Sequence, residues 1–497
     1  MNKGSQAFKR EKSMADLTRE EVEDILNQLK EVREREAEEA EANKGKPQEE
    51  EPEVEEEPSE NGNDETGEDL NEGTAGAIDL EEKTSEEEED DTPHLRDMDL
   101  SGLDLSNLIF YGADIRNSKL VGTRLTDSDL SDCLLDHADL NKADLTDAIL
   151  NDTKMTLANL TDSVMERADL RRAVLRESTL TRANLVDAKL IKADCSKTVT
   201  TSANLTGADL SRASFKQADL TDTNLSDAKL SIGVFFETNF TNAQLTRAEI
   251  KGAKLHGALF QNTKMMRVDC TNADMTEVKM IRAEVARARF NGSIMRRANL
   301  EGSNLSECIM DIADLNNAIL NDVKLDGAHM NRTKLNDAKL RGAVLRGVHL
   351  SRAKLVKADL TGSDLSDANL EGADLTEALL DDSDLSRANL KEAVLGKASL
   401  KNSALAGADL RKAKLKGAVL EGADLAGARL RHASLVKAHL KGADLHRTEL
   451  DEADFSNADL QGANLTGAKL WEANLTQANL EGAKTDHADF TDAKGYK

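Results

Sequence analysis

From Met98 onward, hydrophobic residues recur at every fifth position of the chain. The central residue of each five-residue unit, here called position i, falls on every multiple of five from Leu100 to Phe490, which gives 79 consecutive units without an insertion or deletion. Of these residues 56 are leucine, and the others are Phe, Met, Ile, Val or Cys except for Thr200 and Thr485. Position i−2 is small in nearly every unit, and positions i−1, i+1 and i+2 are mostly polar. Each unit therefore has two inward positions and three outward ones.

A period of five fits neither the 3.6-residue period of an α-helix nor the two-residue alternation of a long strand. It fits a short β-like segment at i−2, i−1 and i, followed by a corner of two residues. Corners of this kind need a positive φ angle, which glycine adopts without a Cβ clash. Of the 24 glycines after residue 97, 21 lie at i+2, and no proline occurs in the repeat. The pattern predicts stacked coils with a left-handed backbone at i+2 and inter-coil hydrogen bonds that proline would interrupt.

Units such as ADLTEALL, ANLEGADL and ADLQGANL resemble the A(D/N)LXX units of the pentapeptide-repeat family over about residues 98–490. The resemblance implies an all-β fold, a right-handed quadrilateral β-helix with four units per coil, in which residues 20 apart stack. It also implies about twenty coils and, at roughly 4.7–4.9 Å per coil, a rod ~95 Å long. We assign this repeat domain to residues 93–497.

Two parts of the repeat depart from the common pattern. Met98, Leu103 and Leu108 are the only large residues at i−2, and we interpret them as a first coil that closes its own end. Between residues 235 and 295, position i is mostly Phe, Met, Val or Ile rather than Leu. This composition predicts a bulkier, less regular core, interpreted as repacking at a bend or join, with a functional hinge as the alternative.

The N-terminal region contains a predicted amphipathic helix over residues 14–43. Thr18 and Glu21 form a capping box, and Leu17 with Val22 fits a hydrophobic staple. A single apolar stripe at helical spacing follows, made of Val22, Ile25, Leu26, Leu29 and Val32. Because an isolated helix of this length is marginal in water, the stripe needs a partner. That partner is either another protein or the first coil of the rod, which the helix would then cap.

The charge of the chain is concentrated in its N-terminal part. Residues 1–97 carry a net charge of −23, whereas the remaining 400 residues carry −5. Residues 44–92 are acidic, contain Pro and Gly, and lack core-forming residues, so they are predicted to be a disordered linker. Residues 1–13 are also predicted to be disordered, and Met14 is an alternative start of the chain.

The sequence contains no motif that points to catalysis or a cofactor. GxGxxG, P-loop and GxSxG patterns are absent, so we expect neither an enzyme nor a cofactor. His329 and His349 would stack on successive coils, but no third metal ligand is evident, so we expect no metal site. No apolar stretch is long enough for a membrane span, and no secretory signal is evident. All four cysteines face inward in the predicted register, which indicates a reducing compartment, and we expect a cytoplasmic location.

Two kinds of surface feature point to binding. Ile232, Val234 and Phe236 all point outward within one unit, and basic residues surround them in the predicted stacking. An apolar patch with a basic rim is a candidate docking site, although incidental surface residues are the alternative. Charge also alternates in bands: residues 332–357 hold eight basic residues and one acidic, and residues 371–384 hold six acidic and no basic. These bands either steer partners or simply balance a solvated surface.

The sequence therefore predicts a non-catalytic protein-binding scaffold or adaptor, a rigid β-helical rod with a tethered N-terminal docking helix. The alternative comes from the family resemblance: some members protect or inhibit DNA gyrase by imitating DNA in shape and charge. The nearly neutral rod and the uninterrupted repeat argue against that role, and also against direct binding of nucleic acid. An end-to-end dimer through the C-terminal coils, near Phe455, Leu480 and Phe490, is a further possibility because coil ends expose unpaired strand groups.

Overall fold

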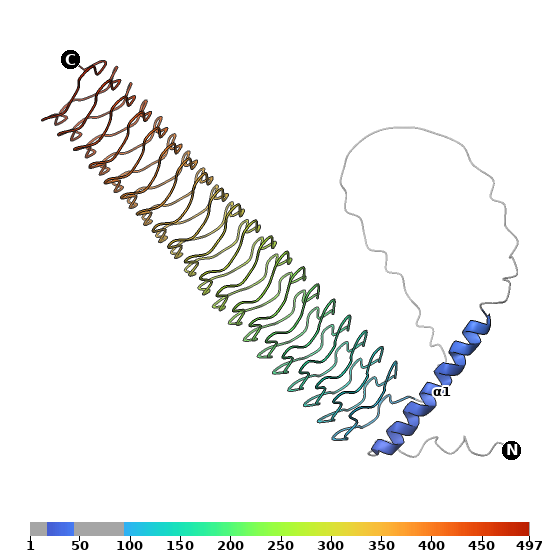
Figure 1. Ribbon diagram of the computed structural model, residues 1–497. Coiled ribbons are helices and arrows are strands. Elements are labelled where there is room, and N and C mark those ends of the chain that lie inside the picture. Colours follow the sequence, from blue (N-terminus) through green and yellow to red (C-terminus); the bar gives the residue numbers. More distant parts are fainter. Residues whose placement is uncertain (1–16, 44–93, 497) are drawn as a thin grey trace, which may run out of the picture.

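A computed structural model describes residues 17–43 and 94–496, and it contains a helix and a long straight rod. The helix, α1 (Arg19–Asn43), lies across one end of the rod, and the C-terminus lies at the other end (Figure 1). The observed helix falls within the predicted range 14–43. The disorder predicted for residues 1–13 and 44–92, and the alternative start at Met14, concern positions outside the described residues.

The rod is built from parallel β-bridges between residues 20 apart. Each residue at i−1 pairs with the residue at i−1 four units later, without a break from Asp99–Lys119 to Asn474–Lys494. Each bridge involves a single residue, and within residues 94–496 there is no strand of greater length. Four five-residue units therefore complete one coil, as the resemblance implied, and residues 20 apart form ladders along the rod.

The backbone hydrogen bonds explain why the repeat tolerates no insertion. The N–H at i donates to a carbonyl of the next coil, as from Leu140 to Asn159 over 2.8 Å, and the N–H at i+2 does the same. The N–H at i−1 donates to a carbonyl of the preceding coil, as from Asp139 to Ser118 over 2.9 Å. The N–H at i−2 closes the corner by donating to position i of the preceding unit. Four of the five amides of a unit are thus paired by the backbone.

In units with Asp or Asn at i−1, that side chain commonly pairs the fifth amide, at i+1. Asp144 Oδ1 accepts the Thr146 amide at 3.1 Å and the Thr146 hydroxyl at 2.6 Å. This local turn gives a physical reason for the frequent Asp or Asn, Leu, Ser or Thr order in the sequence. Positive φ angles occur at i+2 along the whole rod, from Asp97 at 60° to Asp492 at 57°, which confirms the predicted corner conformation.

The core is a continuous column of the residues at i and i−2. Position i is buried from Leu95 to Leu475, and only the last coil is less covered. Serine and threonine at i−2 are also buried, and their hydroxyls donate to core-facing carbonyls, as Thr123 does to Leu100 over 2.7 Å. The four cysteines are buried and free, as predicted from the register.

The segment between residues 235 and 295 keeps the regular bridge register, so the structure shows no bend or hinge there. Larger side chains are accommodated by stacking: the rings of Phe240 and Phe260 are 4.8 Å apart and nearly parallel. Space for Phe235 comes from Gly233 at i−2, because a Cβ at Gly233 would lie 2.6 Å from the Phe235 ring. A smaller residue at i−2 thus compensates for a larger one at i, and the irregular core that the sequence suggested is not needed.

Candidate protein-binding surfaces

Helix α1 packs its apolar stripe onto the end of the rod. Its capping box forms as predicted: the Thr18 amide donates to Glu21 Oε2 at 2.8 Å, and the Glu21 amide donates to Thr18 Oγ1 at 3.3 Å. The apolar side chains of the helix join one core cluster with the large i−2 residues of the first coil. The members at this interface are Leu17, Val22, Ile25, Leu26, Leu29, Met98, Leu103 and Leu108. Val32 is half-buried.

The predicted docking stripe is thus occupied within the chain. Val22, Leu26 and Leu29 are buried, and Ile25 is partly buried. The arrangement corresponds to the capping alternative, in which α1 covers the first coil. Binding of another protein through this stripe requires α1 to leave the rod.

Two arginines of α1 complete the hydrogen bonding of the first coil. Each carbonyl at i−1 or i+1 normally accepts an amide of the preceding coil, but the carbonyls of the first coil have no such neighbour. Arg19 donates to the Asp104 carbonyl at 2.9 Å and to the Ser106 carbonyl at 3.1 Å. Arg33 donates to the Tyr111 carbonyl, and its guanidinium lies 6.0 Å from the centre of the Tyr111 ring. The helix therefore supplies donors that a preceding coil supplies elsewhere in the rod.

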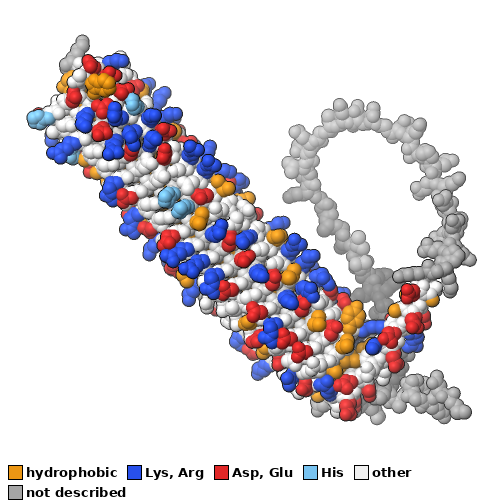
Figure 2. Space-filling view, viewed as in Figure 1, with side chains coloured by type: hydrophobic (Ala, Val, Ile, Leu, Met, Phe, Trp, Pro, Cys, Tyr) orange, Lys and Arg blue, Asp and Glu red, His pale blue; other side chains and the backbone are white. Residues whose placement is uncertain are grey.

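A groove of about 770 Å³ runs between α1 and the first coil. Its apolar wall includes Ile109 and Tyr111, which are 69 % and 51 % exposed, and Leu26 and Leu29 line the other side. Hydrophobic side chains gather where the helix meets the rod in the space-filling view (Figure 2). Ile109 was not among the candidates from the sequence, because a single apolar residue at an outward position gives no signal there.

The predicted patch at Ile232, Val234 and Phe236 lies on one edge of the rod. Ile232 is 57 % exposed, and Val234 and Phe236 are half-buried. Ile232 belongs to a corner ladder, here called the 232–312 corner, which consists of Ile232, Gly252, Asn272, Gly292 and Ile312. Ile312 is 59 % exposed, so an exposed isoleucine lies at each end of this corner. Ile312 was missed in the sequence, although an apolar residue at the outward position i+2 is the same signal as at Ile232.

Both isoleucines occupy a backbone conformation that suits them poorly. The φ angle is 61° at Ile232 and 58° at Ile312, in the left-handed region that favours glycine and asparagine. A β-branched side chain at such an angle is strained. Most of the other residues at i+2 are Gly, Asp, Asn, Lys or Arg, so most corners carry either a polar side chain or none.

Several charged corners are neutralised by ion pairs between coils. Arg167 pairs with Asp147 and Arg387 pairs with Asp367 through two hydrogen bonds each, and in both cases the partners lie on successive coils. The hydrogen bond from Arg167 lowers the pKa of the Asp147 carboxyl below its usual range. Such exposed pairs mainly balance charge, since solvent screens them and each contributes little to stability.

Other classes of site find no support in the part of the chain that the structure describes. Within residues 17–43 and 94–496, no group of three or more His, Cys, Asp or Glu side chains could hold a metal ion. No helix in those ranges is both long and apolar enough to cross a bilayer. Burial raises the pKa of the Cys133 and Cys308 thiols to about 12, so neither thiol is poised as a nucleophile.

Comparison with solved structures finds further repeat proteins. HetL, a pentapeptide repeat protein involved in heterocyst differentiation regulation in the cyanobacterium Nostoc sp. strain PCC 7120, is 32 % identical, with 46 % of this chain and 89 % of that chain covered and a TM-score of 0.27. A pentapeptide repeat protein of the Arabidopsis thaliana thylakoid lumen is 32 % identical, with 19 % and 66 % covered and a TM-score of 0.19. QnrB1, a plasmid-mediated fluoroquinolone resistance protein, is 22 % identical, with 34 % and 84 % covered and a TM-score of 0.29. No curated protein matches the chain significantly.

The family assignment comes from the repeat itself. The sequence model described as "Pentapeptide repeats (8 copies)" matches in successive segments, beginning with residues 94–127 and ending with 458–494. These matches cover most of the rod and well over half of the chain, and proteins of this kind fold as right-handed β-helices. The 20-residue stacking, the small residue at i−2 and the glycine-rich corner at i+2 all agree with that fold. The chain belongs to the pentapeptide-repeat family.

Proposed function

We propose that this protein is a non-catalytic protein-binding scaffold, in which the rigid rod presents apolar anchor residues to a partner. The observation that carries the proposal is the pair of exposed isoleucines, Ile232 and Ile312, at left-handed corner positions. A non-glycine residue in this conformation costs roughly 1–2 kcal/mol. Because each side chain is more than half exposed, packing within the chain offsets little of that cost.

The corner conformation belongs to the fold, but among the described residues with positive φ only Ile232 and Ile312 are β-branched, and strained residues of this kind often mark functional surfaces. Asparagine or glycine at the same corner would remove the strain without disturbing the core, since the side chains at i+2 point outward. An isoleucine gains free energy at such a position when a partner removes it from water, by about 1.5–3 kcal/mol for a fully buried side chain. The two anchors are therefore suited to a protein partner with complementary pockets.

The surroundings of the 232–312 corner suit an elongated partner. Ile232 and Ile312 are four coils apart, or ~19 Å at roughly 4.8 Å per coil. Gly252 follows Ile232 on the corner ladder and Gly292 precedes Ile312. Because neither glycine has a side chain, the surface next to each isoleucine is open. Val234 and Phe236 extend the apolar surface beside Ile232, and Ile294, which is part-exposed, lies beside Gly292. A helix or extended segment lying along the rod could contact both anchors.

Two further parts of the proposal concern the ends of the rod. A docking role for the stripe of Val22, Ile25, Leu26, Leu29 and Val32 requires release of α1 from the first coil. Release would expose the apolar end of the rod, so it is expected only when a partner binds both surfaces. At the other end, Leu480 and Phe490 are only half-buried, and the Phe490 ring stacks on Tyr496 with centres 3.7 Å apart. We propose end-to-end pairing of two copies through this coil as a secondary mode of association.

The scaffold proposal is tested by replacing the anchors with residues that prefer the same backbone. Ile232→Asn and Ile312→Asn together keep the corner conformation and remove the apolar side chains. Arg212→Asn, at φ 61° on the same corner ladder, is the matched control. Partners are captured from lysate of the source cells with a photo-crosslinking group at position 234. A protein captured by the native chain and by the control, but lost with the double variant, supports the proposal; identical capture by all three overturns it.

The same capture decides on the alternative, a DNA-mimicking modulator of a topoisomerase such as DNA gyrase. That role requires an extended acidic face, whereas the residues after position 97 are close to neutral and basic and acidic residues alternate along the rod. The alternative would replace the scaffold proposal if gyrase subunits were recovered and their capture depended on the acidic residues of the rod rather than on Ile232 and Ile312.

A further inference from the structure

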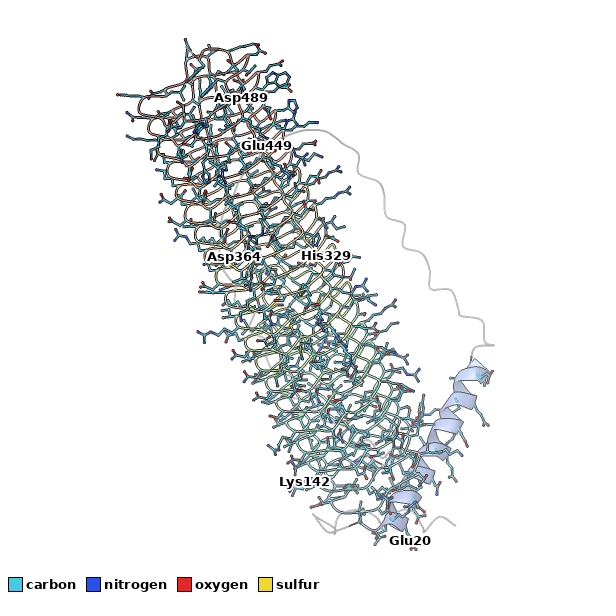
Figure 3. All side chains as sticks on the ribbon, turned by 60° about the vertical axis from the view of Figure 1, so that its left-hand side comes forward. Glu20, Lys142, His329, Asp364, Glu449 and Asp489 are labelled. Carbon is cyan, nitrogen blue, oxygen red and sulfur yellow. The ribbon has the colours of Figure 1, made fainter. Side chains whose placement is uncertain are left out.

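The middle of the rod contains basic side chains of one type stacked on one another. His329 lies near the middle of the rod's length (Figure 3), and its ring centre is 4.6 Å from that of His349 on the next coil. Two neighbouring ladders repeat the arrangement in the same two coils. The three stacked pairs are His329 with His349, Arg332 with Arg352, and Lys334 with Lys354. We call this surface the 329–354 basic patch.

The two corner arginines of the patch lack the carboxylate partner that several other corner arginines have. Arg167, Arg182 and Arg387 are also corner residues, and each pairs with an aspartate of the preceding coil. Within the described residues, neither Arg332 nor Arg352 forms an ion pair, and both are exposed. Like charges placed directly opposite each other on neighbouring strands are destabilising. The patch therefore costs stability in the isolated chain, and a bound anion would reverse that cost.

At the patch, as in other units without Asp or Asn at i−1, the usual side-chain acceptor for the amide at i+1 is missing. In Asp384-Leu385-Ser386-Arg387 the aspartate accepts the Ser386 amide at 2.8 Å. In His349-Leu350-Ser351-Arg352 histidine takes the place of that aspartate. Within residues 94–496, no acceptor is found for the Ser351 amide or for its hydroxyl. Two neutral donors and the Arg352 guanidinium thus stand next to one another without an intrachain acceptor.

The shape of the surface limits the size of the ligand. A hollow of about 330 Å³ opens beside Arg332, Ser351 and Arg352, over Gly372, which lacks a side chain. Glu371, which stacks on Ser351 one coil later, and Glu392 also line the hollow, and Asp314 lies 3.5 Å from Lys334. These carboxylates interrupt the basic surface, whereas a long polyanion such as a nucleic-acid backbone needs an extended one. A compact anion fits between them.

We propose that the 329–354 basic patch binds a phosphate group, either free or as a phosphate monoester on a protein partner. Arg352 and Arg332 would donate to the phosphate oxygens as paired guanidinium groups, and the Ser351 amide and hydroxyl would donate to the same oxygens. Lys334 and Lys354 add attraction around them. The patch adjoins Ile312 on the same corner ladder, so a partner docked on the 232–312 corner would place a phosphorylated side chain within reach. The site itself does not depend on the scaffold proposal, because inorganic phosphate alone tests it.

The decisive variant is His349→Asp in the full chain. Aspartate restores the acceptor found in the Asp384–Arg387 unit and places a carboxylate beside Ser351, so folding is preserved while the anion site is removed. Arg352→Asn, which suits the left-handed corner, removes one guanidinium. Arg387→Asn, at the matched corner that pairs with Asp367, is the control.

Binding is measured by isothermal titration calorimetry with inorganic phosphate and with a phosphoserine peptide, with the unphosphorylated peptide as a reference. We expect phosphate binding by the native chain, a loss of about tenfold in affinity with Arg352→Asn, and no detectable binding with His349→Asp. The Arg387→Asn control should bind like the native chain. Tighter binding of the phosphopeptide than of free phosphate identifies a protein source, and equal binding identifies the free ion. Absence of phosphate binding, equal loss in the control, or tighter binding of duplex DNA overturns the proposal.

Discussion

The guanidinium of Arg19 donates to the backbone carbonyl of Ser106 over 3.1 Å, in the place where a preceding coil would supply an amide. The same group also reaches the Asp104 carbonyl at 2.9 Å. A solenoid must satisfy the backbone groups and cover the apolar side chains of its first coil, because no neighbour does so. In this chain one amphipathic helix does both: its arginines donate hydrogen bonds to the free carbonyls, and its leucines cover the core.

Loss of the two arginine contacts should loosen the cap but leave the rest of the rod folded. For Arg19→Ala with Arg33→Ala we expect local opening of α1 and the first coil to become easier by about 1–2 kcal/mol, after allowing for solvent exposure of both groups. Coils contact only their neighbours, so distant coils should not respond. Hydrogen exchange of residues 95–111, compared with residues 400–450, measures the effect.

Lys30→Ala is the control for the cap, because Lys30 pairs with Glu34 on the same helix at 3.9 Å and forms no ion pair with the described part of the rod. Exchange in this variant should match the native chain. If Lys30→Ala loosens the first coil as much as the arginine pair does, the loss reflects helix propensity or net charge rather than the satisfied carbonyls.

A second prediction concerns Gly233, which makes room for a phenylalanine in the core. A Cβ there would lie 2.6 Å from the Phe235 ring and 3.1 Å from the Leu230 carbonyl oxygen. Gly233→Ala should therefore destabilise the rod by about 1–3 kcal/mol, the usual cost of overpacking. Gly396→Ala is a contrasting substitution, since the nearest atom to its Cβ, the Lys416 carbonyl oxygen, is 3.9 Å away.

Urea denaturation of the two alanine variants measures the difference. Gly396→Ala should be neutral or slightly stabilising, because alanine restricts the unfolded chain more than glycine does. Equal stability of both variants would show that the core near Phe235 relaxes freely, against the packing seen in the structure.

The repeat could be predicted from the sequence because its determinants are local and repeated many times. The coil backbone explains the small residues at i−2, the bulky residue at i and the frequent glycine at i+2. The Thr18–Glu21 capping box is likewise a local feature. The position of α1 on the rod was one of two alternatives, since an apolar stripe does not specify what covers it. The roles of Arg19 and Arg33 could not be predicted, because the free carbonyls of the first coil become evident only once the direction of every inter-coil hydrogen bond is known.

The binding surfaces were predicted only in part. Ile232 stood out because three apolar residues shared one unit, whereas Ile312 is isolated in sequence and becomes notable only through its φ angle and its place on the same corner. Similarly, the basic band at 332–357 was evident from composition. The missing acceptor for Ser351 appears only by comparison with the hydrogen bonds of the Asp384–Arg387 unit.

The cysteines provide a test of the continuous core. Cys133, Cys195, Cys270 and Cys308 are all buried and free, and burial raises the pKa of the Cys133 thiol to about 12. Since the thiolate is the reactive form, the folded protein should react with a thiol reagent such as DTNB only as fast as coils open. In the time in which all four thiols of the urea-unfolded protein react with DTNB, we expect less than one thiol per folded chain to react. Rapid reaction of the folded chain would contradict the burial of the column.

The last prediction concerns acid. Asp314 accepts hydrogen bonds from Arg296 at 2.8 Å and from the Asn316 amide at 3.3 Å, and Lys334 lies 3.5 Å away. Burial opposes ionisation of this carboxyl, but the hydrogen bond from Arg296 and the other contacts outweigh it and lower the pKa below its ordinary value of 3.8. A carboxyl whose pKa is lower in the folded state stabilises the fold above the unfolded value, and that stability disappears as pH falls through the folded value.

Asp314→Asn should therefore destabilise the rod at pH 7, and its difference from the native chain should shrink as the pH falls below 4. Urea midpoints at pH 7, 5, 4 and 3 measure this trend. Asn299→Ala, which removes the acceptor of the Glu301 amide at 3.0 Å but no ionisable group, provides a control whose difference should not depend on pH. If the Asp314→Asn difference stays constant from pH 7 to pH 3, the carboxylate at position 314 contributes through its shape and hydrogen bonds rather than through its charge.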